Sequence, residues 1–222
     1  MCKTKVISLL LSLVVLLCSF LWGFRNLPVV EEPEEDREEE VLTGNIPFES
    51  LFRQYAPEIG WSWEMLAALC WEESHWNPQA ASASGARGLM QLMPVTGRRF
   101  GLNDSTFCLP EDNLRAGIQY IRHLQRTFSF IADSAENQHF VLASYNAGPA
   151  HIMDARRLAK RYGRSPYIWF DNTEYWLQQL QYPEFAEDSV VLYGSFNPIE
   201  TVSYVKKVKR TYKRIINNTN NH

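Results

Sequence analysis

The sequence predicts an all-α domain, and three observations support that fold class. From Asn45 onward, the apolar residues recur at the three- and four-residue spacing of a helix. No stretch shows the regular apolar and polar alternation of a strand, and no internal repeat is present. The chain has 222 residues, of which 45% are hydrophobic and 21% charged, enough for one well-buried domain. We therefore expect a single helical domain over residues 45–216, followed by a flexible tail at 217–222.

The first helices are predicted from their apolar spacing and their caps. A short helix is marked by Phe48, Leu51, Phe52 and Tyr55 and ends near residues 57–60. Ser62 is a good N-cap for a second helix, which runs from Trp63 to about Ser74.

The later helices follow from the same spacing and from terminating glycines and prolines. We expect helices over about 94–100, 140–147 and 150–162, with residues 164–196 less regular. Apolar stripes mark two longer helices, one through Leu114, Ile118, Ile121 and Leu124, and a C-terminal one through Val202, Val205, Val208, Tyr212 and Ile215.

Residues 1–26 are expected to be a signal peptide or a membrane anchor. Two lysines precede an apolar run from Val6 to Phe24, which is about long enough to span a bilayer. Bulky residues stand where a cleavage site needs small ones, so we favour an uncleaved anchor. Cleaved and lipidated forms, the latter through Cys18, stay open. The lysines place the rest of the chain outside the cytoplasm.

Residues 27–44 are predicted to form a disordered acidic linker. Of the 22 cations and 25 acids in the chain, the first forty residues hold four and eight, and all eight acids lie between Glu31 and Glu40. We interpret this run as a solvated spacer rather than as an acidic binding site. The remainder, with 18 cations and 17 acids, is almost neutral. That balance argues against a nucleic-acid-binding protein.

The second predicted helix carries the strongest candidate for chemistry. At about 100° per residue, Glu73 falls within the apolar side formed by residues such as Leu66, Leu69 and Cys70, while Glu72 falls at its edge. Desolvation raises the pKa of a carboxyl group, as a general acid requires near neutral pH. The alternative is two exposed, idle glutamates at a fraying helix end, and we favour that interpretation for Glu72.

Four motifs in order give the sequence a family resemblance. The first is Glu73-Ser74 with Pro78, Ala80, Ser82, Gly85-Ala86 and the run from Gly88 to Pro94. The others are Asn113 to Gly117 with Tyr120, Ala143 to Pro149, and Glu200 to Val205. Together they resemble the soluble-lytic-transglycosylase family. Residues 52–56 and 60–63 resemble its membrane-bound lytic transglycosylase F branch.

The resemblance implies a lysozyme-like (goose-type/transglycosylase) fold and cleavage of the β-1,4 bond between N-acetylmuramic acid and N-acetylglucosamine. Glu73 would protonate the glycosidic oxygen. As a carboxylate it would then help to deprotonate the muramic-acid C6 hydroxyl, which closes a 1,6-anhydro ring. The open alternatives are a muramidase that uses water instead, with a second carboxylate from Asp112, Asp154, Asp171 or Glu200, and a non-catalytic peptidoglycan-binding protein.

The resemblance also implies roles for further side chains. Ser82 would hydrogen-bond near the acid, and Gln91 and Met93 would line the sugar cleft. Tyr145 would orient Glu73 or the sugar, with Asn146 supporting the turn. Glu200 and Tyr204 would close the far wall, and simple core packing is the alternative for Met93 and Tyr204. Trp71 and Trp76 can stack on sugars or pack in the core.

The remaining features favour a simple enzyme of the cell envelope, on its periplasmic side. We expect peptidoglycan glycan strands as the partner, a monomer, no cofactor and no metal, because the five histidines lack zinc spacing. A disulfide between Cys70 and Cys108 is left open. Cations such as Lys207 and Lys213 make the last predicted helix basic. Anionic polymers or lipid headgroups could bind this face, but we interpret it as a solvated helix face.

Overall fold

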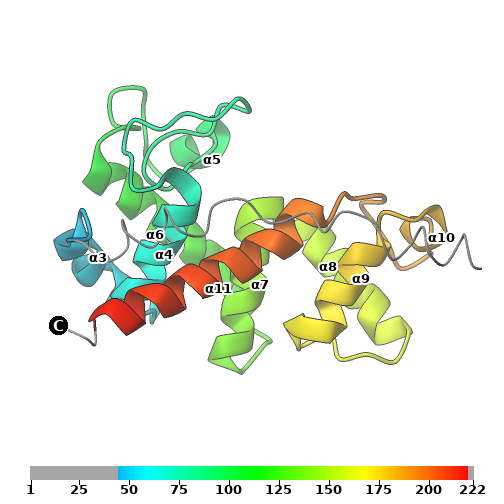
Figure 1. Cartoon of the computed structure of the whole chain (residues 1–222). Helices are drawn as coiled ribbons and strands as arrows, with labels where there is room; N and C mark the ends of the chain where they lie inside the picture. Colours follow the sequence, from blue (N-terminus) through cyan, green and yellow to red (C-terminus); the bar gives the residue numbers. More distant parts are fainter. Residues whose placement is uncertain (1–44, 220–222) are drawn as a thin grey trace, which may run out of the picture. The chain divides into compact units, whose positions relative to one another are not determined.

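The computed structural model describes residues 45–219, and every regular element in this range is a helix (Figure 1). Within the range, bridges occur only as isolated pairs of Arg87 with Ala81 and with Leu92. The elements are α3 (Glu49–Tyr55), η1 (Ala56–Ile59), α4 (Trp63–Ser74), α5 (Pro94–Arg99), α6 (Pro110–Thr127), α7 (Ser134–Ala147), α8 (Pro149–Arg161), η2 (Trp169–Thr173), α9 (Glu174–Gln179), α10 (Pro183–Ala186) and α11 (Ile199–Thr219). The all-α prediction is thus confirmed for these residues.

The predicted membrane segment (1–26) and acidic linker (27–44) lie outside the described residues. Among the helices of residues 45–219, none combines the length and the apolar character needed to cross a membrane.

Helix α4 has the bounds that its sequence predicts. The Ser62 hydroxyl accepts a hydrogen bond from the Met65 backbone N–H at 3.3 Å, which caps the first turn. The helix ends because His75 and Trp76 adopt left-handed backbone angles, with φ of 51° and 59°. The indole N–H of Trp76 then donates to the carbonyl of Ala67 at 2.8 Å and anchors the turn. The last turn of α4 therefore has a fixed position.

Helix α11 packs against α4 more extensively than any other pair of helices in the described range, and it also contacts α7 (Figure 1). Its buried face contains Thr201, Tyr204, Val205, Val208, Thr211 and Ile215. The helix continues to Thr219, so residues 217–219 are helical rather than part of the predicted tail.

Two other predictions of local structure need correction. Helix α7 begins at Ser134 rather than near Phe140, because the Asp133 carboxylate accepts from the N–H groups of Ala135 and Glu136 at 2.8 and 3.0 Å. Residues 164–196 contain η2, α9 and α10, although the backbone of η2 is interrupted at residues 170–171.

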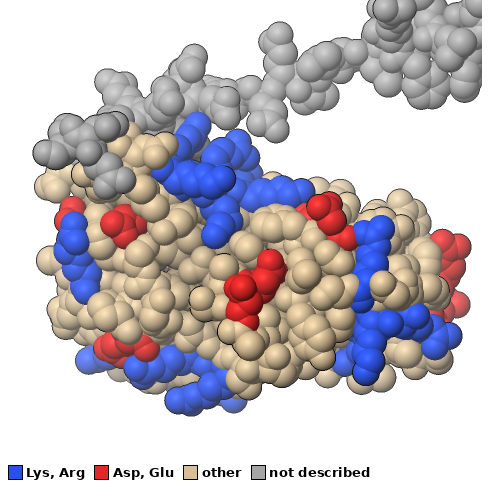
Figure 2. Space-filling model, turned by 90° about the horizontal axis from the view of Figure 1, so that it is seen from below, with Lys and Arg blue, Asp and Glu red and all other residues tan. Residues whose placement is uncertain are grey.

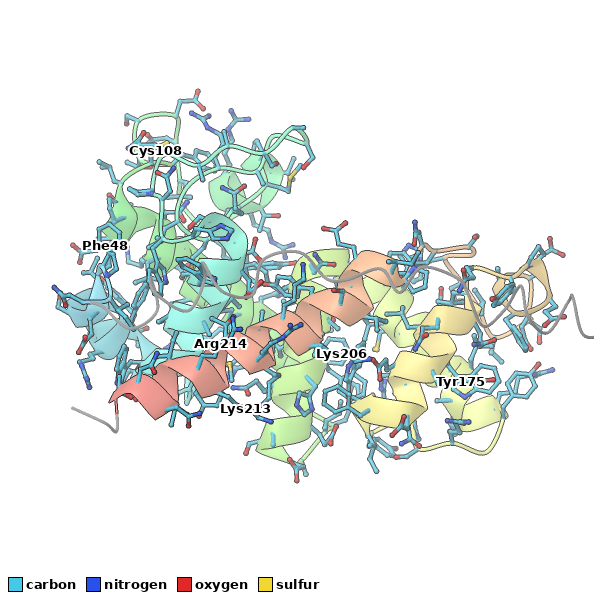
Figure 3. All side chains as sticks on the ribbon, in the orientation of Figure 1. Phe48, Cys108, Tyr175, Lys206, Lys213 and Arg214 are labelled. Atoms are coloured by element: carbon cyan, nitrogen blue, oxygen red, sulfur yellow. The ribbon has the colours of Figure 1, made fainter. Side chains whose placement is uncertain are left out.

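The two cysteines for which pairing was left open are both free thiols. Cys70 is buried on α4, and Cys108 lies in the loop before α6 (Figure 3). Burial raises the pKa of the Cys70 thiol well above its ordinary value, and the nearby charge of Glu73 raises it further. Cys70 thus behaves as an apolar core residue.

The charges of the domain are mixed. Figure 2 shows Lys and Arg side chains in several groups on one face, with acids and broad uncharged areas between them. On α11, Lys206 forms an ion pair with the buried carboxylate of Glu174 at 2.8 Å, and Lys213 is exposed further along the helix (Figure 3). The arrangement agrees with the nearly neutral balance of the sequence.

Candidate active site

The C-terminal turn of α4 presents two consecutive glutamates, Glu72 and Glu73, and both are half-buried. The helix contributes a buried row that includes Leu66, Leu69 and Cys70. Because α11 packs along this helix, both carboxyl groups lie within reach of α11 side chains. The prediction that Glu73 loses solvation is confirmed, whereas the prediction that Glu72 is exposed is wrong.

Glu73 is held by a tyrosine from the other end of the domain sequence. The Tyr204 hydroxyl donates to Glu73 Oε1 at 2.5 Å. Burial is the main cause that raises the pKa of Glu73, to about 8, and the charges of Glu72 and Glu200 raise it further. The hydrogen bond from Tyr204 opposes these effects. Glu73 is therefore mainly protonated at neutral pH, as a general acid must be.

We expect Tyr204→Phe to raise the pKa of Glu73 above its value of about 8. The tyrosine hydroxyl favours the ionised carboxylate, so its removal favours the protonated form. Carbon-13 NMR titration of the Glu73 side-chain carboxyl, assigned by comparison with Glu73→Gln, measures the change. If Glu73 has the same pKa in Tyr204→Phe as in the wild type, the hydrogen bond has no electrostatic role.

Glu72 is bound to α11 as well. The Thr211 hydroxyl, itself buried, donates to Glu72 Oε1 at 2.5 Å. Consecutive residues of α4 are thus attached to two points on α11.

Asn113 of α6 hydrogen-bonds to the segment between α4 and α5, residues 75–93, which we call the small-residue loop. The Asn113 side chain accepts from the Met90 N–H at 2.7 Å and donates to the carbonyls of Phe107 and Arg87 at 2.9 and 3.2 Å. Gly88 makes this approach possible, because a Cβ there would lie 2.3 Å from the Asn113 amide and φ is +84°. The resemblance singled out Asn113 within a motif, but no role for it was predicted.

Two predicted site residues of this loop shape its backbone. The amide of Gln91 donates to the carbonyls of Ala80 and Gly88, both at 3.0 Å, and φ at Gln91 is 45°. The hydroxyl of Ser82 accepts from the Ala86 N–H at 2.9 Å and contacts Ser84, rather than Glu73. Ser82 is exposed, and its hydrogen bonds lie within its own loop.

Met93 and Tyr145 are placed differently from each other. Met93 directly precedes α5 and is 44% exposed, which excludes the core interpretation of its side chain. The Tyr145 hydroxyl donates to the Met90 carbonyl at 2.8 Å, so its proton is directed at the loop and not at Glu73. Burial and then the neighbouring charge of Glu73 raise the pKa of Tyr145 well above its ordinary value. Tyr145 therefore lies near the acid.

Asn146 joins the end of α7 to the first turn of α11. Its carbonyl oxygen accepts from the Thr201 hydroxyl at 2.7 Å, and its amide donates to Glu200 Oε1 at 3.5 Å. Glu200 is exposed, whereas Tyr204 is only 8% exposed. Trp71 and Trp76 are 5% exposed and pack edge to face, so both belong to the core.

The four candidates for a second carboxylate are not equivalent. Asp112 pairs with Arg115 at 2.5 Å. Asp154 is buried, pairs with Arg157, and accepts from the backbone N–H groups of residues 192 and 193 at 2.8 Å. Asp171 is exposed in η2. Of the four, Glu200 alone acts on the titration of Glu73.

No group of three or more His, Cys, Asp or Glu side chains in residues 45–219 is arranged to hold a metal ion. Glu73 is the carboxyl whose pKa is raised furthest toward neutrality in this part of the molecule, and side chains of α7 and α11 act on it or lie near it.

Comparison with known proteins places this geometry in a family. The family model described as "Transglycosylase SLT domain" matches residues 50–168. The chain is 39% identical over 166 residues to a Membrane-bound lytic murein transglycosylase F from Vibrio cholerae, covering 75% of this chain and 30% of that protein. It is 39% identical over 169 residues to a protein of the same name from Maricaulis maris, covering 76% of this chain and 36% of that protein.

A solved structure shares the fold. The 70 kDa soluble lytic transglycosylase SLT70 from Escherichia coli superposes with a TM-score of 0.51 and 26% identity, covering 78% of this chain and 25% of that one. The lysozyme-like fold implied by the motifs is confirmed. The chain spans about a third of the length of the curated relatives it matches.

Proposed function

The chain belongs to the transglycosylase SLT domain family, and on that basis we propose that it is a peptidoglycan lytic transglycosylase. It would act as a lyase on the β-1,4 bond between N-acetylmuramic acid and N-acetylglucosamine and leave 1,6-anhydro-muramic acid ends. The names of the relatives, lytic murein transglycosylases, support this reaction and this substrate.

The observation that carries the proposal is the state of Glu73. A half-buried carboxyl with a pKa of about 8 holds its proton at neutral pH and can deliver it to the glycosidic oxygen. Tyr204 occupies Oε1 as a donor, which leaves Oε2 to carry the proton. After bond cleavage, the Glu73 carboxylate accepts the proton of the C6 hydroxyl as that oxygen attacks C1.

A single carboxyl is sufficient for this sequence of steps. The nucleophile belongs to the substrate and is already close to C1 through the sugar's own covalent structure. The arrangement differs from the two-carboxylate pattern of most glycosidases. Asp112 and Asp154, two of the candidates for a second carboxylate, are each engaged in an ion pair on their own helix, which supports a mechanism with one carboxyl.

We assign substrate contacts to residues of the small-residue loop, of the end of α7 and of the start of α11. Met93 offers an exposed apolar side chain at the start of α5, and Glu200 an exposed carboxylate at the start of α11. Gln91 and Ser82 would act by shaping the loop, and Tyr145 and Asn146 by fixing the elements beside the acid. The glycan would bind across these elements.

We also propose that the protein works in the cell envelope, on the periplasmic side, as a monomer. The lysines and apolar run of residues 1–26 support membrane attachment, and the acidic residues 27–44 a spacer before the catalytic domain that begins at residue 45. The name of the relatives, which includes "membrane-bound", is consistent with this location.

The rate of glycan cleavage is expected to fall as the pH rises through about 8. Glu73 donates its proton only while it is protonated, and its raised pKa keeps it protonated below that pH. Initial rates of release of soluble muropeptides between pH 3 and pH 9.5, roughly, give the profile. An alkaline limb near the ordinary pKa of a glutamate would contradict the role of burial.

Mass spectrometry of the products tests the proposed function. The full chain is incubated with purified sacculi, and the released muropeptides are weighed. Anhydro ends are lighter by one water than the ends left by hydrolysis. Hydrated ends would identify the muramidase alternative, and the absence of soluble products would identify a binding protein.

A further inference from the structure

The contact between α4 and α11 contains a second hydrogen bond beside that of the catalytic acid. Tyr204 donates to Glu73, and Thr211 donates to Glu72. The two donors are seven positions apart, so they lie about two turns apart on one face of α11. Both are buried, at 8% and 3% exposure. Consecutive carboxyl groups of α4 are thus attached to separate points along the same helix.

We propose that Glu72 and Thr211 form a positioning pair for Glu73, in which Thr211 holds the Glu72 carboxylate against α11 and thereby fixes the last turn of α4 beside Tyr204. This inference rests on the proposed function, in which Glu73 is the acid. Nothing in the motif pattern assigned a role to either residue of the pair.

The pair also sets the charge that Glu73 experiences. The groups that act electrostatically with Glu73 are Glu72 and Cys70 on α4, Tyr145 on α7, and Tyr204 and Glu200 on α11. Of these, Glu72 is the charged group that raises the pKa of Glu73 most, after burial, and Tyr204 lowers it. The two hydrogen bonds from α11 therefore fix two groups with opposite effects on the pKa of Glu73.

Thr211 matters because a glutamate side chain is long and can rotate. Without a buried donor, the Glu72 carboxylate would turn toward solvent, where water and salt screen its charge. Bound to a buried hydroxyl, the charge stays at a fixed place near Glu73. A threonine suits this role because its β-branched side chain has few rotamers in a helix.

The test measures the titration of Glu73 in the full chain by carbon-13 NMR and the rate of muropeptide release against pH. Glu72→Gln keeps an acceptor for Thr211 but removes the charge, so Glu73 is expected to titrate at lower pH and the alkaline limb to follow. Thr211→Val is expected to shift the titration in the same direction and to lower kcat about tenfold through misplacement of the acid. Thr211→Ser is expected to keep both the Glu73 titration and kcat near their wild-type values. Tyr204→Phe is expected to shift the titration in the opposite direction.

Two matched controls separate the pair from general effects. Glu64→Gln removes a charge from the first turn of α4, and Thr173→Val removes a buried hydroxyl in η2 that has no hydrogen-bond partner. Both are expected to leave the Glu73 titration unchanged.

The positioning pair is contradicted if Glu73 titrates alike in Glu72→Gln and the wild type, or if Thr211→Ser is no better than Thr211→Val. The titration needs no turnover, so it also separates this inference from the proposed function. A shifted titration in a chain that releases no anhydro products would refute the function and leave the pair standing. An unshifted titration in an active enzyme would refute the pair alone.

Discussion

Replacing Glu73 with glutamine is expected to lower the rate of glycan cleavage at least about a hundredfold at neutral pH. Glutamine has nearly the same shape as a protonated glutamate, but it has no acidic proton to donate and cannot later accept one. The Tyr204 hydroxyl can still donate to the amide oxygen, so the contact between α4 and α11 is retained. The loss is therefore expected in kcat, measured as the release of soluble muropeptides from purified sacculi.

The folded state of Glu73→Gln is expected to be at least as stable as the wild type at pH 7. A carboxyl with a raised pKa stabilises the fold fully only below its ordinary pKa of 4.5, and that contribution is lost progressively as the pH rises toward about 8. Glutamine does not titrate and avoids this loss. A thermal midpoint equal to or above that of the wild type serves as the control, and a variant that digests sacculi at the wild-type rate would remove Glu73 from the mechanism.

Asn113→Ala is expected to lower the free energy of unfolding by about 3 kcal/mol, because three hydrogen bonds are lost, two of them to the small-residue loop. The variant leaves the Met90 N–H and the carbonyls of Arg87 and Phe107 without their partner beneath the loop. Asn113 is fully buried, so these groups cannot simply turn to solvent. Urea unfolding of the full chain followed by tryptophan fluorescence measures the change.

Activity is expected to fall together with stability in Asn113→Ala, because Met90 also receives the hydrogen bond of Tyr145 beside the acid. Gln119→Ala, on the exposed face of the same helix, is the matched control and is expected to change stability by less than about 0.5 kcal/mol. If the two variants unfold at the same urea concentration, Asn113 does not support the loop.

Local rules predicted most of the helices that carry the site. Ser62 caps α4 as its sequence indicates, and the apolar stripe of α6 is buried as expected. The predicted helix over about 140–147 was shorter than α7, and the cause of this difference was also local. The cap provided by Asp133 starts α7 several residues before its apolar stretch, and a polar first turn carries no apolar periodicity.

The contacts that tune Glu73 could not be predicted, because they join residues that are distant in the sequence. Tyr204 and Glu73 are 131 positions apart, and Thr211 and Glu72 are 139 apart. Helical periodicity indicates which face of α11 is buried, but it does not indicate which residue of α4 that face meets.

The origin of the nucleophile is the central claim, and cleavage in water enriched in the heavy oxygen isotope tests it most directly. Purified sacculi are digested by the full chain in this water, and the muramic-acid ends are weighed by mass spectrometry beside those from a hydrolytic lysozyme. If the C6 hydroxyl attacks C1, the ends are anhydro and contain no heavy oxygen. Incorporation of one heavy oxygen at C1, as the lysozyme control gives, would contradict the account.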